Sequence, residues 1–188
     1  MTGKNIFKRL KPLFVLLQLL ARIIPLFIIN FFWSLLLPFE GKISCGFRYV
    51  LLARLCKNCG DNVFIGRNVT IKNTFNLVVG SNVSIHANSY IDAVGEISIK
   101  DNVSIAHNSS LISFDHSWND ETKPIKYNST KNGPIFIDSD VWIGCGVRVL
   151  SNTTIKPRTI IAAGSVVKGT CDSHSIYAGV PAKKIKDI

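Results

Sequence analysis

The sequence predicts an all-β fold, a parallel β-helix with three faces per turn, preceded by an N-terminal apolar helical segment. Two observations predict the β-helix: an aliphatic residue returns every six positions, and motifs such as Asn82-Val83-Ser84-Ile85 and Asn102-Val103-Ser104-Ile105 repeat. A third observation, a basic and apolar stretch in the first 57 residues, predicts the helical segment. A six-residue period fits neither an α-helix nor an ordinary strand, whose periods are about 3.6 and 2.

The aliphatic repeat defines the β-helix turn by turn. Its members are Ile65, Ile71, Val79, Ile85, Ile91, Ile99, Ile105 and Leu111, then Ile137, Ile143, Val149, Ile155, Ile161 and Val167. A chain that bends after each step points every member into a triangular prism, stacked on its counterpart in the next turn. Asn and Asp stand just before many of the strands, where they tolerate the conformations that a corner requires.

Length and spacing divide the chain into three parts. Residues 1–57 are expected to form the helical membrane-associating segment and a cap, residues 58–172 the β-helix, and residues 173–188 a C-terminal tail. A loop at residues 113–134 is expected to protrude from the β-helix, because the aliphatic repeat stops there. A chain of 188 residues is long enough for one well-cored domain with an appendage.

The net charge of +10 is concentrated at the N-terminus. Residues 1–57 hold nine basic residues and one acidic residue, a net +8, whereas residues 58–188 hold thirteen and eleven, a net +2. A basic and apolar terminus favours anionic lipid as a partner. Nucleic acid is not expected, since it would require a basic stripe on the folded domain itself.

The five cysteines do not indicate a disulfide framework or a metal site. An odd number without dense spacing is typical of a reducing compartment. Cys56 and Cys59 have the CxxC spacing, but no second Cys/His pair stands at a spacing that would complete four zinc ligands. No metal is therefore expected.

The run from Leu13 to Leu37 is apolar except for four residues, and it predicts contact with a membrane. Pro25 divides it into two pieces that are each too short to cross a bilayer, so a kink or hairpin is expected between Arg22 and Pro25. Basic residues flank both sides, which predicts a monotopic or re-entrant attachment through residues 1–38 at the cytoplasmic face of the inner (cell) membrane. A signal peptide is disfavoured because no small-residue cleavage site follows, whereas burial of the run in an oligomer stays open.

The interruption from Ser113 to Pro134 contains Asp115-His116-Ser117-Trp118, and it is the candidate active site. Loops of this length inside a compact domain tend to be functional. An imidazole, with an ordinary pKa near 6.5, can take up a proton at neutral pH, which is the task of a general base. His116 is therefore the candidate general base, and a solvated loop histidine is the alternative.

The chain also resembles a known family. The motifs Val141-Trp142-Ile143-Gly144, Ile161-Ala162-Ala163-Gly164-Ser165-Val166-Val167 and Ala178-Gly179-Val180-Pro181-Ala182-Lys183, together with the six-residue steps and the loop histidine, resemble the left-handed β-helix (hexapeptide-repeat) acyltransferases. The most similar subgroup is that of the sugar and polysaccharide O-acetyltransferases. The resemblance implies a left-handed β-helix, a homotrimer, and acetyl-CoA as co-substrate in the groove between neighbouring subunits.

The resemblance also implies roles for individual residues. His116 matches the catalytic base, and the cofactor-binding positions match Trp142, Cys145, Ala163, Lys168, Gly169, Lys183 and Lys186. The backbone N–H of residue 145 is expected near the thioester carbonyl, and the small side chain of residue 163 beside the pantetheine arm. The alternatives are that Trp142 packs against a neighbouring subunit and that the lysines form a solvated basic tail.

The acceptor side is less well defined by the sequence. Asn88 and Asp92 resemble the residues that hold sugar hydroxyls in members with small sugar substrates. Either Trp118 or Tyr90 is expected to stack on a pyranose ring, or else the aromatic residues there only pack the loop. Asp115 is expected beside the acceptor or against the ring of His116, and a backbone carbonyl could orient that ring equally well. Lys123, Lys126 and Lys131 either attract an anionic acceptor or keep the loop solvated.

These observations predict a membrane-associated O-acetyltransferase. It would transfer acetyl from acetyl-CoA to a saccharide hydroxyl, on a lipid-linked or nucleotide-linked intermediate of surface polysaccharide synthesis. Three alternatives stay open: an N-acyltransferase acting on an amino-sugar nucleotide, a serine-type or xenobiotic acetyltransferase, and a non-catalytic or metal-binding β-helix protein.

Overall fold

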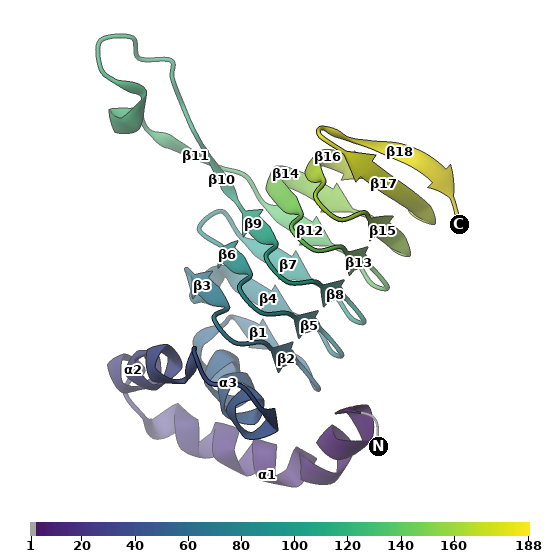
Figure 1. Ribbon diagram of the computed structural model, residues 1–188. Coiled ribbons are helices and arrows are strands. Elements are labelled where there is room, and N and C mark those ends of the chain that lie inside the picture. The colour runs from purple at the N-terminus through teal and green to yellow at the C-terminus, as the bar shows by residue number, and fades with distance from the viewer. Residues whose placement is uncertain (1–2) are drawn as a thin grey trace.

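The computed structural model describes residues 3–188, which form a helical cap at one end of a parallel β-solenoid (Figure 1). The cap consists of α1 (Gly3–Ile23), α2 (Leu26–Leu36) and α3 (Lys42–Leu55), which lie beneath the first turn of the solenoid. Residues 1 and 2 belong to the predicted segment 1–57 but lie outside the described residues.

The solenoid has three faces, each made of parallel strands from successive turns. Face 1 consists of β2 (Phe64–Ile65), β5 (Ser84–Ile85), β8 (Ser104–Ile105), β13 (Trp142–Ile143), β15 (Thr159–Ile161) and β17 (Ser175–Gly179). Face 2 consists of β3 (Thr70–Lys72), β6 (Tyr90–Asp92), β9 (Ser110–Ile112) and the first parts of β14 (Arg148–Ile155) and β16 (Val166–Cys171). Face 3 consists of β1 (Asn58–Cys59), β4 (Leu77–Val79), β7 (Ile97–Ile99), β12 (Ile135–Ile137) and the second parts of β14 and β16.

The predicted aliphatic repeat forms the core of this prism. On face 1, for example, Ile65 is in register with Ile85, and Ile85 with Ile105. All of the aliphatic positions predicted to point inward, from residue 65 to residue 167, are buried. Each fully buried side chain of this kind contributes about 1.5–3 kcal/mol relative to an exposed one, so the stacked columns are the main source of stability. The predicted β-helix is confirmed.

Asparagines occupy the corners, as the sequence predicts. Asn62, Asn82 and Asn102 have φ angles of 56°, 57° and 60° at the corner before face 1. This left-handed conformation is tolerated by Asn better than by most residues with a Cβ. Their amides also form a ladder, because Asn62 donates to Asn82 at 3.0 Å and Asn82 donates to Asn102 at 3.1 Å.

The corner between faces 2 and 3, called here the 2–3 corner, takes up all the length variation between turns. Both eight-residue steps pass through it, the first as the short helix η1 (Thr74–Asn76). The long interruption leaves and re-enters at the same corner. It forms a hairpin of β10 (Phe114–His116) and β11 (Thr130–Asn132) with η2 (Ile125–Tyr127) near its tip, and it projects away from the solenoid (Figure 1).

The helical cap breaks where the sequence predicts. α1 ends at Ile23, and Pro25 precedes the first residue of α2. The rings of Phe7 and Phe14 in α1 stack 5.4 Å apart and both meet the edge of Tyr49 in α3. Within residues 3–188, none of the helices combines the length and the apolar character needed to cross a bilayer.

Arg48 and Arg54, two of the basic residues that follow the apolar run, have structural roles in the cap. Arg48 is fully buried and donates hydrogen bonds to the carbonyls of Leu36, Phe39 and Ile65 at 2.8–2.9 Å. Arg54 donates to the carbonyl of Ala21 at 3.2 Å. Both guanidinium groups therefore satisfy carbonyls near the C-terminal ends of α1 and α2, which favour positive charge.

The C-terminal residues do not leave the solenoid as the tail that was expected for residues 173–188. β17 extends face 1 beside β15, and β18 (Ala182–Asp187) folds back antiparallel to β17. The reason is that Tyr177 stands six residues after Cys171 and occupies one more inward position, in register with Ile161. This hairpin closes the end of the prism opposite the helical cap (Figure 1).

Candidate active site

The hairpin that carries His116 is anchored at its root by Ser113. This residue is fully buried, and its hydroxyl donates to the carbonyl of Asp92 at 2.7 Å and accepts from the amide of Gly95 at 2.9 Å. Its own carbonyl accepts from the amide of Gly133, where the chain returns. A Cβ on residue 95 would stand 2.1 Å from the carbonyl oxygen of Ser113, so the close approach requires glycine at that position.

His116 and Asp115 point to opposite sides of the hairpin. Successive side chains alternate along a strand, so Phe114 and His116 share one side of β10, and their ring centroids are 6.0 Å apart. The side chain of His116 is exposed. Asp115 points back toward the solenoid and makes no hydrogen bond to His116 within residues 3–188. The expectation that Asp115 orients the ring of His116 by direct contact is therefore not met.

Asp115 instead ties the hairpin to the body of the solenoid. Its Oδ2 accepts a hydrogen bond of 2.6 Å from the hydroxyl of Ser151 and one of 3.2 Å from the ammonium of Lys168. Ser151 is fully buried in the bend of β14. The hydrogen bond from Ser151, and then the charge of Lys168, lower the pKa of the Asp115 carboxyl below its ordinary value, so the carboxylate is the stable form.

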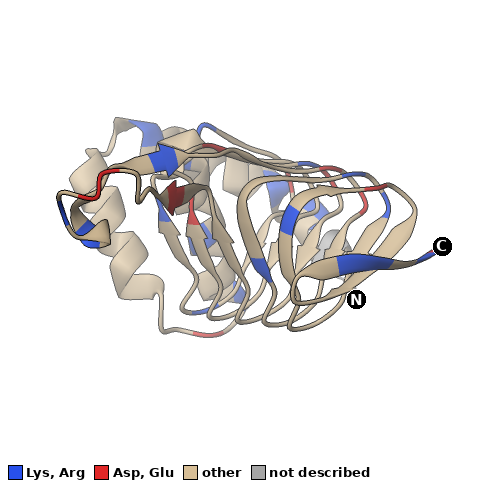
Figure 2. Ribbon diagram, turned by 90° about the horizontal axis from the view of Figure 1, so that it is seen from above, with Lys and Arg blue, Asp and Glu red and all other residues tan. Residues whose placement is uncertain are grey.

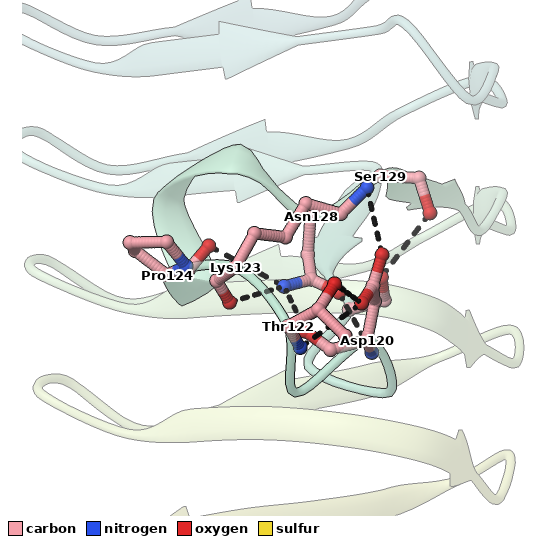
Figure 3. Close-up of polar contacts among 7 residues, drawn as sticks. Asp120, Thr122, Lys123, Pro124, Asn128 and Ser129 are labelled. Carbon is pink, nitrogen blue, oxygen red and sulfur yellow. Dashed lines mark hydrogen bonds and ion pairs between the residues drawn. The ribbon is translucent and has the colours of Figure 1, made fainter.

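The tip of the loop is held together by Asn128, the residue at the centre of Figure 3. Its Nδ2 donates to the carbonyls of Asp120, Lys123 and Pro124, and its Oδ1 accepts from the amide of Asp120 at 3.0 Å. Asp120 also pairs with Lys123 at 2.8 Å. Lys123 is therefore already paired within the loop, which weakens the idea that all three loop lysines attract an anion.

Trp118 and Tyr127 remain largely exposed on this ordered loop, with 68% and 67% of their surfaces accessible. Figure 2 shows that the loop carries both acidic and basic residues at its tip. Trp118 is thus placed to contact a ligand or another subunit, and it does not pack into the loop as the alternative interpretation held.

The predicted thioester-binding residues lie together at the corner between faces 1 and 2, called here the 1–2 corner. The carbonyl of Cys145 accepts a hydrogen bond from Gly164, one turn further on, at 2.8 Å. The backbone N–H groups of Cys145 and Ala163 donate no hydrogen bond within residues 3–188. Two amide donors without acceptors are thus available at this corner, as an oxyanion or a carbonyl would require.

Small residues give access to these amides. A Cβ on Gly144 would stand 2.6 Å from the backbone nitrogen of Ala163, so the two turns can approach this closely only with glycine there. Ala163 is exposed and its side chain leaves the backbone uncovered. Trp142 lies nearby on face 1, with 55% of its surface exposed, and it borders a shallow hollow of about 260 Å³.

The remaining predicted cofactor residues fall into two groups. Lys183 and Lys186 are exposed on β18, which lies beside β17 at the end of face 1. Lys168 and Gly169 lie instead where β16 bends around the 2–3 corner, on the side of the hairpin. One chain therefore places Trp142, Cys145 and Ala163 at one corner, and His116 with Lys168 at another.

Asn88 and Asp92 stand at opposite ends of the second turn of face 2. Asn88 is exposed at the 1–2 corner, with φ of 59°. Asp92 is buried near the root of the hairpin, where its carboxylate accepts hydrogen bonds from Asn73 at 2.7 Å and Tyr90 at 3.3 Å. Asp92 therefore supports the corner from which the hairpin leaves, and the two residues do not converge on one ligand within a single chain.

Metal ligation has no geometric support among residues 3–188, which contain no cluster of three or more His, Cys, Asp or Glu side chains able to hold an ion. His86 and His107 occupy successive turns, and burial and the charge of His107 lower the pKa of His86. Cys45, Cys56, Cys59, Cys145 and Cys171 are all free thiols.

Three residues that position the site could not be singled out from the sequence. Ser113, Ser151 and Asn128 are ordinary turn residues in a chain rich in Ser and Asn. Ser113 has one signal, since it follows the last aliphatic position before the interruption. Nothing in the sequence distinguishes Ser151 from the other serines, because its partner Asp115 is 36 residues away.

Comparisons with known proteins agree with this geometry. Residues 134–169 match the family described as bacterial transferase hexapeptide (six repeats). The chain is 30% identical to galactoside O-acetyltransferase of Escherichia coli over 75% of its own length and 68% of that protein. It is 32% identical to dTDP-4-amino-4,6-dideoxy-D-glucose acyltransferase of Escherichia coli over 68% of this chain and 72% of that protein. The chain spans 43% of another relative, a probable acetyltransferase of Mycobacterium tuberculosis that is 36% identical over 68% of this chain.

A solved structure of galactoside acetyltransferase in complex with coenzyme A has a similar fold. Its TM-score is 0.73 at 25% identity, over 86% of this chain and 82% of that one. The fold and the site thus define a left-handed parallel β-helix of the acyltransferase type. The chain belongs to the hexapeptide-repeat acyltransferase family, which confirms the predicted family and the predicted class of acyl-CoA-dependent acyltransferase.

Proposed function

We propose that the protein transfers acetyl from acetyl-CoA to a hydroxyl group of a saccharide, with His116 as general base. The observation that carries the proposal is the division of the site between two structures. One is an anchored hairpin that exposes an imidazole, and the other is a corner with free amides at Cys145 and Ala163. A proton acceptor and carbonyl-polarising donors are the two groups that acyl transfer to an alcohol requires.

Each residue has a defined task in this reaction. His116 removes the proton from the acceptor hydroxyl as its oxygen bonds to the thioester carbonyl carbon. The amide of Cys145 donates to the carbonyl oxygen as negative charge develops there. His116 then returns the proton to the sulfur that departs when the C–S bond breaks. Acetyl-CoA supplies the activated acetyl group, and Trp142, Ala163, Lys183 and Lys186 line the path that would hold it.

We further propose that the site is completed in a homotrimer. His116 and the 1–2 corner cannot serve the same thioester within one chain, because they lie at different corners of the prism. The hairpin projects outward, as required if it reaches the 1–2 corner of a neighbouring chain (Figure 1). Lys168 of one chain would then join Lys183 and Lys186 of its neighbour around the same cofactor.

His116→Ala tests the base. We expect the rate constant for acetyl transfer, kcat, to fall by about 10²–10⁴, the usual contribution of a general base. Binding of CoA and the thermal unfolding midpoint should stay unchanged, because the side chain is exposed. His174→Ala is the matched control, since His174 lies in a corner far from the hairpin. Equal activity of His116→Ala and wild type would overturn this assignment.

We propose that the helical cap holds the enzyme at the cytoplasmic face of the cell membrane, where lipid-linked saccharides would be its acceptors. The supporting observation is an exposed apolar stripe: Leu13, Leu16, Leu20 and Ile23 on α1, and Phe27 and Phe31 on α2. Ile23 and Phe27 expose 81% and 74% of their surfaces. A patch of this kind on a basic helix is typical of a surface that contacts a membrane.

Flotation with vesicles that contain anionic lipid tests the membrane contact. Wild-type protein should float with the vesicles, and the triple variant Leu16→Ser, Leu20→Ser and Phe27→Ser should remain in solution. These substitutions are preferable to deletion of residues 1–38, because Phe7 and Phe14 pack on Tyr49 and their loss would expose the core of α3. Flotation of the triple variant would contradict this placement.

An N-acyltransferase acting on an amino-sugar nucleotide is the second candidate. It is favoured by one observation, the 32% identity to an acyltransferase whose name specifies an amino-deoxy sugar linked to dTDP. The same histidine and the same amide corner would serve an amine acceptor. Parallel assays with matched hydroxyl and amino sugars, free and nucleotide-linked, separate the two, because only the preferred acceptor should gain acetyl mass at low concentration. Family membership argues against a non-catalytic protein.

A further inference from the structure

Within residues 3–188, a second cavity lies outside the candidate active site. It is a groove of about 800 Å³ between the first half of α1, the start of α3 and the first two turns of face 1. The N-terminal half of α1 lies on the same side of the molecule as β2 and β5 (Figure 1). A volume of this size falls in the range of sites that hold small molecules.

The walls of the groove are apolar and rigid. They are formed mainly by Ile6, Phe7, Leu10, Phe14, Val63 and Phe64. The stacked rings of Phe7 and Phe14 fix one wall, and a Cβ on Gly46 would stand 3.1 Å from the ring of Phe14. The groove is therefore shaped by close packing.

The buried polar groups beside the groove are already occupied, whereas Ser84 and His86 on face 1 and Lys42 at the rim have no side-chain hydrogen bond within residues 3–188. The guanidinium of Arg48 donates to three backbone carbonyls and to the sulfur of Cys45, and the hydroxyl of Tyr49 donates to the carbonyl of Gly60. No buried side-chain nitrogen or oxygen among residues 3–188 lacks a hydrogen-bond partner. A sugar or nucleotide inside the groove would leave most of its own polar groups unpaired, at a cost of several kcal/mol, so the groove selects a hydrocarbon.

The residues at the rim of the groove indicate which kind of hydrocarbon binds there. Leu10 lines the groove and is also 41% exposed, at the start of the apolar stripe that continues along α1 to Ile23. A chain leaving a bilayer along this stripe would enter the groove without crossing water. The exposed rim carries Lys42, together with Arg67, which pairs with Glu40 at 2.9 Å. The ammonium group of Lys42 could form an ion pair with an anionic group joined to the hydrocarbon.

We propose that this groove binds the hydrocarbon chain of the lipid anchor that carries the acceptor saccharide, with the anionic linkage at Lys42. The inference rests on the proposed function, since it names the class of acceptor. It adds a binding site for the anchor that is separate from the site of acetyl transfer. The size of the groove then limits which hydrocarbon chains fit. The protein prefers acceptors whose anchor has a single long chain and a negatively charged linkage.

The test uses Cys45, a free thiol that lines the groove. The full-length protein is treated with N-ethylmaleimide in the presence of octyl, decyl or dodecyl phosphate below their micelle concentrations, and labelling is followed by mass spectrometry. Dodecyl phosphate should protect Cys45 and leave Cys145, which does not line the groove, as reactive as before. Each added CH₂ should tighten the half-protecting concentration by about fourfold while the chain still fits.

Two variants test whether the alkyl phosphate binds inside the groove. Ser84→Trp should fill the groove and abolish protection, because Ser84 points outward from face 1 into it. Ser104→Trp is the matched control, one turn further along in register with Ser84, and it should leave protection unchanged. Circular dichroism establishes that both variants are folded.

The outcomes separate this inference from the proposed function, because binding is measured without acetyl transfer. Unchanged labelling of Cys45 at every chain length, or equal protection in Ser84→Trp, would overturn the lipid-anchor site even if soluble saccharides were acetylated. Protection that rises with protein concentration alone would assign the groove to a second copy of the chain and would also overturn it. Protection as expected, without acetylation of any saccharide, would sustain the site and contradict the function.

Discussion

Asp115 and His116 are adjacent in β10, yet their side chains point to opposite sides of the hairpin. The side chain of Asp115 points into the solenoid and accepts hydrogen bonds from Ser151 and Lys168, while His116 points outward. In the proposed mechanism, Asp115 would act on His116 through the backbone of the strand, as a positioning residue held by the fully buried Ser151 in β14.

A double-mutant cycle on Asp115 and Ser151 measures this positioning. We expect Asp115→Asn and Ser151→Ala each to lower kcat about tenfold with little change in the KM for acetyl-CoA, because a displaced base slows the chemistry and does not touch the cofactor. The double variant should lose little more than either single variant, since both remove the same contact. Additive losses in kcat would contradict a shared role.

Arg48 shows at the residue scale why charge in a sequence does not reveal location. Arg48 is fully buried. Arg54, the other arginine of α3, is only partly buried and makes one hydrogen bond, to the carbonyl of Ala21. Arg48→Met should destabilise the protein by about 3 kcal/mol, because three carbonyls near the end of α2 and at Ile65 lose their donor. Arg54→Met, the matched control, should cost about 1 kcal/mol. Thermal or urea unfolding measures both, and equal losses would contradict this explanation.

At the scale of elements, the helical cap depends on the packing of α1 and α3 around Tyr49. Burial raises the pKa of the Tyr49 hydroxyl from its ordinary value of 10.0 to about 12. Its neutral form therefore stabilises the folded cap fully below pH 10, and this contribution is lost as the pH rises from 10 through 12. The unfolding midpoint of wild type should fall more steeply over that range than the midpoint of Tyr49→Phe. Parallel decreases would contradict the role of Tyr49.

The parts of the fold that the sequence predicts well are those governed by local periodicity. The aliphatic steps from Ile65 to Val167 determine which side chains point inward, and the break at Pro25 follows from the geometry of proline itself. The site is less predictable because its contacts are distant in sequence. Asp115 meets Ser151 and Lys168 across 36 and 53 positions, and no periodic pattern encodes such pairs.

The C-terminal hairpin illustrates the same limit. Residues 173–188 contain basic residues at spacings typical of a solvated tail, yet Tyr177 continues the inward column of face 1. The inward step from Val167 to Cys171 is four residues and the next inward residue is aromatic, so a search for aliphatic steps of six misses that continuation. As a result, β18 holds Lys183 and Lys186 on a strand beside face 1.

At the scale of the whole molecule, the solenoid separates the parts of the proposed site while holding each one rigidly. The 2–3 corner carries two extra residues in each of two turns and the long hairpin in the next, and the aliphatic positions on both sides stay buried. The 1–2 corner accepts none and keeps Gly144 against Ala163. In the proposed trimer, such a scaffold would build a site by bringing the variable corner of one copy to the invariant corner of another.

Mixed trimers test that arrangement directly. His116→Ala has an intact 1–2 corner but no base, whereas Ala163→Trp has an intact hairpin but a blocked corner. If each site joins the hairpin of one chain to the corner of the next, a trimer assembled from equal amounts of both variants completes a site only when an Ala163→Trp chain precedes a His116→Ala chain. Random assembly gives that order at about a quarter of the sites.

Co-expression of the two variants should therefore restore about a quarter of the wild-type activity per chain, although each variant alone is nearly inactive. The two purified variants, mixed without exchange of subunits, provide the control and should show no recovery. Light scattering establishes that both variants and the mixture are trimers. A co-expressed mixture that stays at the background of the single variants would place the whole site within one chain, and the hairpin would then have to fold back over its own face 2 to reach Cys145.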